Sequence, residues 1–158
     1  MLNKDYKDIL CAFSEENVKF LLVGAYAMAI HGYPRATLDI DLWVMSSPEN
    51  SEAVLRALKR FGAPLHDLTL DDLQRDDTIF QIGVAPRRID IITGVSGLRF
   101  QEAFIGSVEA EIEGSRVRIP SMDDLIRNKR ASGRTKDKAD AEALEALRDA
   151  QKRSKSRG

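Results

Sequence analysis

Two aspartates, one residue apart, interrupt an otherwise apolar segment of the sequence. Asp39 and Asp41 lie within the run 38–44, with Ile40 between them. Side chains alternate between the two faces of a β-strand, so residues i and i+2 point the same way. Both acids would project from one face of a buried strand, where like charges repel and lose hydration. The pattern predicts a positive partner, for which a divalent cation is the natural candidate; the alternative is an edge strand with a solvated acidic face.

A third aspartate, Asp90, lies between two isoleucines in another apolar run. A lone acid in that setting needs a partner for the same reason. If its strand neighbours the strand of Asp39 and Asp41, three carboxylates line one site. Hard oxygen ligands suit Mg²⁺ or Mn²⁺, and acids that serve two metal ions are used for in-line displacement at phosphorus. His31 and His66 are isolated, so nothing indicates zinc.

A strand–glycine–helix junction precedes the acids. Residues 19–23 form a short apolar run that predicts a buried strand, Gly24 follows it, and residues 25–31 predict a short helix. Backbone N–H groups at such a helix start can bind phosphate. Such junctions are common, however, and simple turn geometry is the more frequent reason for them.

The rest of the sequence predicts an α/β domain with a mixed sheet, flanking helices and a C-terminal helical hairpin. Ser47, Pro48 and Gly62 mark the start and end of one helix. The other expected helices are residues 6–16, 68–75, a turn or two within 96–104, 121–132 and 135–152. The other expected strands are residues 37–45, a hairpin formed by residues 78–83 and 87–93, and a pair within 108–119.

Size and charge place limits on the protein. The 158 residues predict one domain over residues 1–150, followed by a basic, disordered tail over residues 151–158. A net charge of −1 argues against an overall electrostatic footprint for nucleic acid, although residues 127–134 hold four basic side chains and no acid. Cys11 is the one cysteine and is expected in the core. With no signal peptide or membrane-spanning run, we expect a cytoplasmic protein without membrane partners.

Together these motifs resemble the nucleotidyltransferase superfamily. The resemblance rests on Gly24, a spacer of fourteen residues, the pair Asp39 and Asp41, and Asp90 in a later apolar strand. More narrowly, the segments 24–44 and 124–140 resemble small bacterial nucleotidyltransferases related to the AbiEii abortive-infection toxins. The resemblance spans about residues 19–147 and implies a nucleotidyltransferase-like fold.

The resemblance implies transfer of a nucleoside monophosphate from a nucleoside triphosphate (NTP), for example ATP, to an acceptor hydroxyl. Asp39 and Asp41 would hold two Mg²⁺ or Mn²⁺ ions, and Asp90 would complete the ion that activates the attacking hydroxyl. The acceptor could be RNA (a tRNA end), a protein or a small hydroxylated molecule such as an aminoglycoside. A toxin–antitoxin or phage-defence setting with a cognate antitoxin protein is also implied. The alternative is a catalytically weak or inactive domain that serves as a nucleotide-binding or partner module.

The resemblance also implies a set of nucleotide-binding residues. Backbone amides at Gly24 and Ala25 would bind the β- and γ-phosphates, Lys129 would contact phosphate, and Arg35 would meet the triphosphate or an acceptor phosphate. A surface ion pair is an equally available role for Arg35. Weaker candidates are Thr37, Lys136 and Asp137. Ala25 departs from the glycine or serine usual in the family; it keeps the backbone N–H but disfavours a positive φ.

Overall fold

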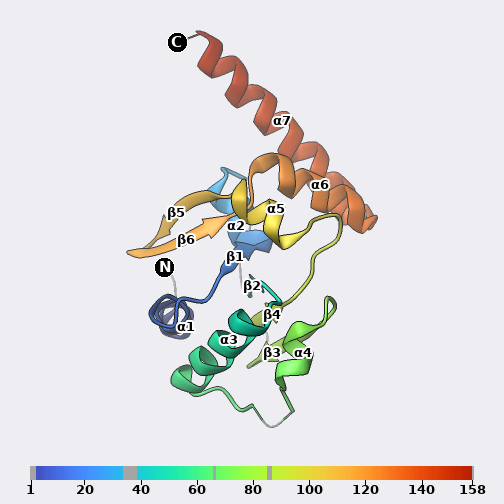
Figure 1. The fold of residues 1–158 in the computed structure, drawn as a ribbon. Coiled ribbons are helices and arrows are strands. Elements are labelled where there is room, and N and C mark those ends of the chain that lie inside the picture. Colours follow the sequence, from blue (N-terminus) through green and yellow to red (C-terminus); the bar gives the residue numbers. More distant parts are fainter. Residues whose placement is uncertain (1–2, 34–38, 66, 85–86, 158) are drawn as a thin grey trace.

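A four-stranded mixed sheet forms the centre of the molecule (Figure 1). The computed structural model describes residues 3–33, 39–65, 67–84 and 87–157. The strand order is β1 (Phe20–Val23), β2 (Ile40–Val44), β4 (Ile89–Ile92) and β3 (Ile79–Ile82). β2 runs parallel to β4, whereas β1 and β3 are antiparallel to their neighbours. The predicted β3–β4 hairpin is therefore confirmed.

Helices flank this sheet, and a two-stranded sheet lies beside β1 and α1. The small sheet pairs β5 (Val108–Ile112) with β6 (Ser115–Ile119). The helices are α1 (Lys4–Glu15), α2 (Gly24–Ile30), α3 (Pro48–Phe61), α4 (Leu70–Gln74), α5 (Phe100–Ile105), α6 (Met122–Ser132) and α7 (Thr135–Arg157). α6 and α7 pack together as the expected hairpin. The α/β fold class with its mixed sheet is confirmed.

The central sheet has two different faces, as the alternation along β2 requires. Ile40 and Leu42 are fully buried in a large core built with α1 and α3. Trp43 points the other way, into a smaller core with α5 that includes Leu21. Asp41 is therefore on the face of Trp43, away from the large core. This division separates the packing that stabilises the sheet from the face that carries the acids.

The sequence signals around α3 act as predicted. The Ser47 side chain accepts a hydrogen bond from the N–H of Asn50 (3.2 Å), and Gly62 ends the helix with a φ of +94°. The buried Asn50 amide also bonds the backbone of Lys19 (2.7 and 3.0 Å) and the carbonyl of Met45 (2.8 Å). This one side chain joins the start of β1 to the end of β2, because it bonds backbone groups of the residue before β1 and of the residue after β2.

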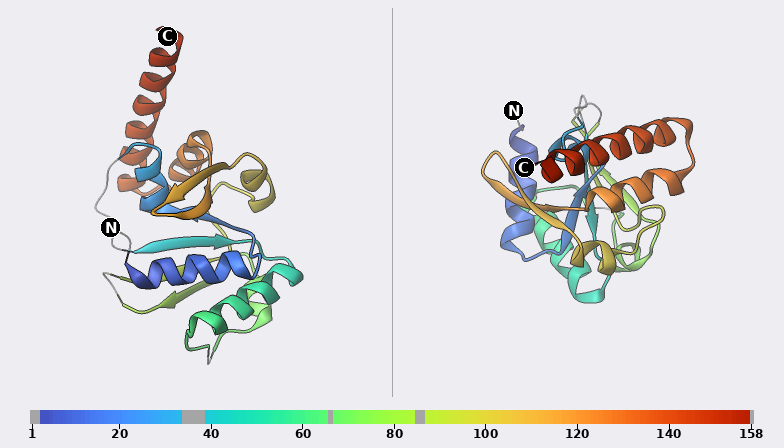
Figure 2. Two further views of the ribbon diagram at one scale, coloured as in Figure 1. Left: turned by 90° about the vertical axis from the view of Figure 1, so that its left-hand side faces the viewer. Right: turned by 90° about the horizontal axis from the view of Figure 1, so that it is seen from above.

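Two expectations are wrong. The sequence predicts that the last helix ends near residue 152 before a disordered tail, but α7 continues to Arg157 and extends beyond the body of the molecule (Figure 2). No glycine or proline interrupts the helix before Gly158. Cys11 is exposed, not in the core; its Sγ donates to Glu15 (3.4 Å), because the buried stripe of α1 runs along a different face. The assignment of residues 1–150 to one domain stays a prediction.

No helix in the part of the chain that the structure describes is long and apolar enough to cross a membrane.

Candidate active site

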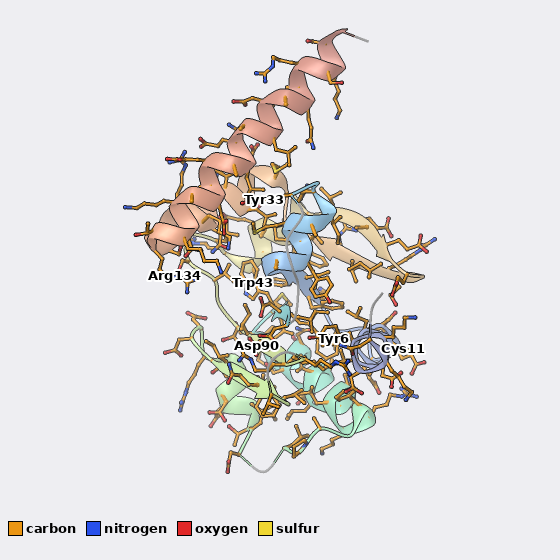
Figure 3. All side chains as sticks on the ribbon, turned by 180° about the vertical axis from the view of Figure 1, so that it is seen from behind. Tyr6, Cys11, Tyr33, Trp43, Asp90 and Arg134 are labelled. Carbon is orange, nitrogen blue, oxygen red and sulfur yellow. The ribbon has the colours of Figure 1, made fainter. Side chains whose placement is uncertain are left out.

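Acids from two neighbouring strands lie at one end of the sheet. The parallel register places Asp41 directly beside Asp90. Asp39 lies one residue before β2, and its Oδ1 accepts a hydrogen bond from the N–H of Arg88, one residue before β4 (3.0 Å). The condition that the strand of Asp90 neighbours the strand of the acid pair is therefore met. Figure 3 shows Asp90 in the middle of the molecule, near Trp43.

Burial, more than any other cause, raises the pKa of the Asp41 carboxyl to about 6. The charge of Asp90, a hydrogen bond with Asp90 and the charge of Asp39 act in the same direction. Arg88 offsets them only in part. A carboxylate in such surroundings is stabilised by an additional cation. The structure thus contains the crowding of negative charge that the sequence predicts.

Gly24 lies against Asp41, and a side chain at this position would have to displace the Asp41 carboxyl group. Its φ is +70°, and a Cβ atom would lie 2.2 Å from Oδ2 of Asp41. Val23, the preceding residue, pairs with Asp41 across β1 and β2. The glycine turn and the acids are therefore brought together. Ala25 follows inside α2 and adopts no positive φ, so the departure from the family's glycine or serine causes no backbone strain there.

Arg88 is a member of this cluster that the sequence analysis missed. Its Nε donates to Oδ1 of Asp90 (2.7 Å), and its Nη2 donates to Oδ2 (3.1 Å). The same Nη2 lies 3.4 Å from Oδ2 of Asp39. The hydrogen bond with Asp90 is the main cause that raises the pKa of Arg88. A signal was present in the sequence, because Arg88 precedes Asp90 by two residues and so shares its strand face.

Tyr6 was also missed. Its side chain is buried, its ring stands edge-on to Tyr26, and its hydroxyl donates to the backbone carbonyl of Arg88 (3.1 Å). Burial, followed by the charges of Tyr26 and Asp39, raises the pKa of Tyr6 to about 12, and Asp41 adds to the shift. Tyr6 is therefore uncharged near neutral pH and acts as a hydrogen-bond donor. No sequence signal separates it from an ordinary core tyrosine.

Lys129 lies in a second charged cluster, in the hairpin of α6 and α7. Its Nζ is 3.5 Å from Asp137 and 3.7 Å from Asp140. Ser132 and Arg134 also donate to Asp137, at 2.5 and 2.7 Å. Burial would raise the pKa of Asp137, but these hydrogen bonds and the charge of Lys129 outweigh it and lower the pKa to about 2. These contacts give Lys129 and Asp137 clear structural partners.

The remaining predicted residues divide into two groups. Lys136 is exposed on the first turn of α7. Arg35 and Thr37 lie outside the described residues.

One contact links the second cluster to the segment after α2, because the Tyr33 hydroxyl donates to Oδ1 of Asp140 (3.5 Å). Figure 3 shows Arg134 at the turn between the two C-terminal helices.

The acid cluster suits a hard divalent cation in its chemistry. Carboxylate oxygens are the ligands that Mg²⁺ and Mn²⁺ prefer, and burial together with the charges of Asp90 and Asp39 raises the pKa of Asp41, so a bound cation would favour its charged form. Within the described part of the chain, no three His, Cys, Asp or Glu side chains are already arranged to hold one ion. The guanidinium of Arg88 instead contacts oxygens of Asp39 and Asp90.

A cavity of about 700 Å³ opens beside the acids rather than around them. Trp43 and Thr93, from the far ends of β2 and β4, line it together with Asp76, Arg99 and Phe100. Trp43 shares a strand face with Asp41, two residues away, a separation of about 7 Å. The buried Nε1 of Trp43 has no hydrogen-bond partner among the described residues. The acids and the cavity therefore lie along one face of the sheet.

Comparisons with known proteins agree with this geometry. No protein-family model and no curated protein sequence matches the chain. Among solved structures, a protein from Thermotoga maritima assigned as a nucleotidyltransferase is similar (TM-score 0.57, 15% identity, covering 97% of this chain and 96% of that one). The antibiotic-resistance factor ANT(2″)-Ia is similar in a solution structure (TM-score 0.56, 18% identity, 96% and 91% covered). Its crystal structure in complex with adenylyl-2″-tobramycin is also similar (TM-score 0.53, 19% identity, 92% and 93% covered). The chain therefore has the fold of the nucleotidyltransferases.

Proposed function

We propose that this protein is a metal-dependent nucleotidyltransferase that moves a nucleoside monophosphate from an NTP to an acceptor hydroxyl. The observation that carries the proposal is the in-register pair of Asp41 and Asp90, with Asp39 beside them and Gly24 against Asp41. The fold is that of the nucleotidyltransferases, and the close approach of these residues to one another supports the proposal. The cluster carries an excess of negative charge, and divalent cations that bind a triphosphate would neutralise it.

The chain's own residues divide the work. Asp39 and Asp41 would hold two divalent ions, and Asp90 would join them at the ion nearer the acceptor. Those ions, when bound, supply charge neutralisation for the triphosphate and lower the pKa of the acceptor hydroxyl. The protein contributes positioning, because Gly24 fixes Asp41 and the β2–β4 register fixes Asp90. This division suits phosphoryl chemistry, where positioning and electrostatics supply most of the catalysis.

Phosphate binding would involve the backbone at Gly24 and Ala25. Their position beside Asp41 supports this assignment, because a triphosphate that shares a cation with Asp41 must pass close to them. Lys129 is a weaker candidate than the sequence suggested, since Asp137 and Asp140 already pair with it. Arg35, Thr37 and Lys136 remain candidates from the resemblance alone.

A label-transfer experiment tests the function. The protein is incubated with Mg²⁺, each NTP labelled at the α- or the γ-phosphate, and separate pools of cellular RNA, cellular protein and tobramycin. We expect α-label, and no γ-label, in one pool, together with pyrophosphate release. Asp41→Asn should lower transfer at least about 1,000-fold while the circular dichroism spectrum stays unchanged.

The matched control is Asp71→Asn, because Asp71 is an exposed acid on α4. Transfer of γ-label would contradict nucleotidyl transfer, and an unfolded Asp41→Asn protein would favour a structural role for Asp41. Tight Mg²⁺-dependent NTP binding without transfer to any pool would favour the binding module.

We also propose, from the resemblance to AbiEii-related proteins, a toxin–antitoxin or phage-defence setting. The test is induction of the chain in growing cells. Growth arrest that requires Asp41 and is relieved by a co-expressed neighbouring gene product supports this setting. Normal growth at high expression contradicts it.

A further inference from the structure

Arg88 occupies the same carboxylate oxygens that a divalent cation would need. Its guanidinium bonds both oxygens of Asp90, at 2.7 and 3.1 Å, and lies 3.4 Å from Oδ2 of Asp39. Paired hydrogen bonds from arginine to a carboxylate are among the stronger polar contacts in proteins. A cation that binds Asp90 must share these oxygens with the guanidinium, whose positive charge repels it, or displace the guanidinium.

The backbone of Arg88 is fixed. Its N–H donates to Asp39 (3.0 Å), and its carbonyl accepts from the Tyr6 hydroxyl (3.1 Å) and from the N–H of Ile40 (3.0 Å). The Arg88 side chain, by contrast, is 30% exposed. An arginine held at its backbone and open to solvent at its side chain can leave the acids without disturbing the sheet.

The charges at the site favour displacement of Arg88 by a cation with triphosphate over displacement by a bare cation. Asp39, Asp41 and Asp90 together carry more negative charge than one guanidinium neutralises, and Arg88 is the cation in contact with Asp39 and Asp90. A bare cation that displaces Arg88 leaves the guanidinium without its anionic partners. A cation that arrives with a triphosphate brings phosphate oxygens, which are good acceptors for a guanidinium.

We propose that Arg88 is a built-in competitor of the bare divalent cation and a ligand of the cation–triphosphate complex. Its guanidinium holds Asp39 and Asp90 until cation and triphosphate enter together, and it then transfers to the phosphates. The site therefore discriminates against a cation without nucleotide. This inference rests on the metal site of the proposed function and adds an order of events to it.

The test measures binding, not turnover. The affinity for Mn²⁺ is measured from the paramagnetic resonance signal of Mn²⁺ in solution, with and without the α,β-methylene analogue of ATP. For Arg88→Met we expect bare Mn²⁺ to bind about tenfold more tightly and the nucleotide analogue with Mn²⁺ to bind about tenfold more weakly. A purely structural residue would shift both affinities in the same direction.

Two variants separate contact from charge. Arg87→Met removes an exposed cation from the preceding position and should leave both affinities within about twofold of the original protein. Arg88→Lys keeps the charge but lacks the planar fork, and should fall between the original protein and Arg88→Met. Equal effects of Arg87→Met and Arg88→Met would overturn the proposal, because general charge would then explain them.

The remaining outcomes are also decisive. Unchanged Mn²⁺ affinity in a folded Arg88→Met protein overturns the competition while leaving the metal site intact. If the original protein binds no Mn²⁺ with or without the analogue, and Asp41→Asn behaves identically, the metal site itself is overturned and the proposal with it. Thermal unfolding of each variant with and without Mn²⁺ confirms that folded protein is being compared.

Discussion

Asp41 and Asp137 are both shielded acids in charged networks, yet their pKa values move in opposite directions. Burial raises the pKa of Asp41 to about 6, and the neighbouring acids Asp90 and Asp39 act in the same direction. Around Asp137 the neighbours are Ser132, Arg134 and Lys129, and its pKa falls to about 2. The cluster around Asp41 carries negative charge that its own residues do not neutralise. The cluster around Asp137 contains the positive charges that neutralise its acid.

This difference separates a cluster that stabilises the fold, around Asp137, from a cluster that suits ligand binding, around Asp41. A network that satisfies its own charges stabilises a helical hairpin and needs no ligand. A network short of positive charge reduces stability unless a ligand completes it, which is a common property of functional sites. Strongly shifted acids alone do not identify a site; the direction of the shift and its cause do.

The largest expected effect compares two glycines with nearly equal φ, one in each region. Gly24 (φ +70°) would place a Cβ 2.2 Å from Asp41, whereas at Gly133 (φ +73°), between α6 and α7, a Cβ meets open space. We expect Gly24→Ala to cost about 3 kcal/mol of unfolding free energy in urea and Gly133→Ala about 1 kcal/mol. Equal costs would show that backbone conformation, not the close approach to Asp41, limits residue 24.

The next effect is in the hairpin cluster. Asp137→Asn should lower the free energy of unfolding by about 2–3 kcal/mol at pH 7. The folded pKa of Asp137 lies below the unfolded value of 3.8, so its stabilisation is present above pH 3.8 and is lost as the pH falls toward 2. Urea titrations at pH 7 and pH 3 measure this. A loss that persists undiminished at pH 3 would assign the effect to packing rather than charge.

The acid cluster should show the opposite sign. The folded pKa of Asp41 lies above its unfolded value of 3.8, so the metal-depleted protein loses stability as the pH rises through about 6. Asp41→Asn should therefore stabilise the chelator-treated protein by about 1–2 kcal/mol at pH 7.5, and by little at pH 4. Addition of Mn²⁺ should reverse the ranking. A variant less stable than the original at pH 7.5 without metal would break the contrast between the clusters.

The smallest effect concerns the end of α7. Lys152 and Lys155 are exposed on the projecting turns of α7, so neither region should depend on them. Lys152→Ala and Lys155→Ala should each change the free energy of unfolding by less than about 0.5 kcal/mol. A larger change in thermal unfolding would show that the hairpin cluster draws support from the far end of the helix.

Local patterns predicted most of the fold. Alternation along β2 predicted both faces of the central strand, and Ser47, Pro48 and Gly62 predicted α3 to the residue. The prediction of a disordered tail was wrong because its basic composition was taken as a sign of disorder, although lysine and arginine are good helix formers. The prediction that Cys11 lies in the core was wrong because its apolar neighbours in the sequence lie on a different side of the helix.

The candidate site was predicted in part. Residues that stand out in their local sequence could be found, whereas residues that reach the site from a distant part of the chain could not. The acids could be found because each breaks a local apolar pattern. Arg88 could have been found from its i,i+2 relation to Asp90. Tyr6 could not, since it reaches the site from a position 82 residues earlier in the chain. Lys129 was assigned to phosphate from the resemblance alone; its pairing with Asp137 could not be predicted, because it depends on how the hairpin folds.

Trp43 gives the molecule an optical consequence. It is the only tryptophan in the sequence, it is buried, and its indole N–H has no partner among the described residues. It shares a strand face with Asp41 and lines the neighbouring cavity. Indole emission depends on local polarity and hydrogen bonding, so the intrinsic fluorescence of the unlabelled protein should report any ligand that enters this face. The unlabelled protein therefore carries one fluorescent reporter two residues from Asp41.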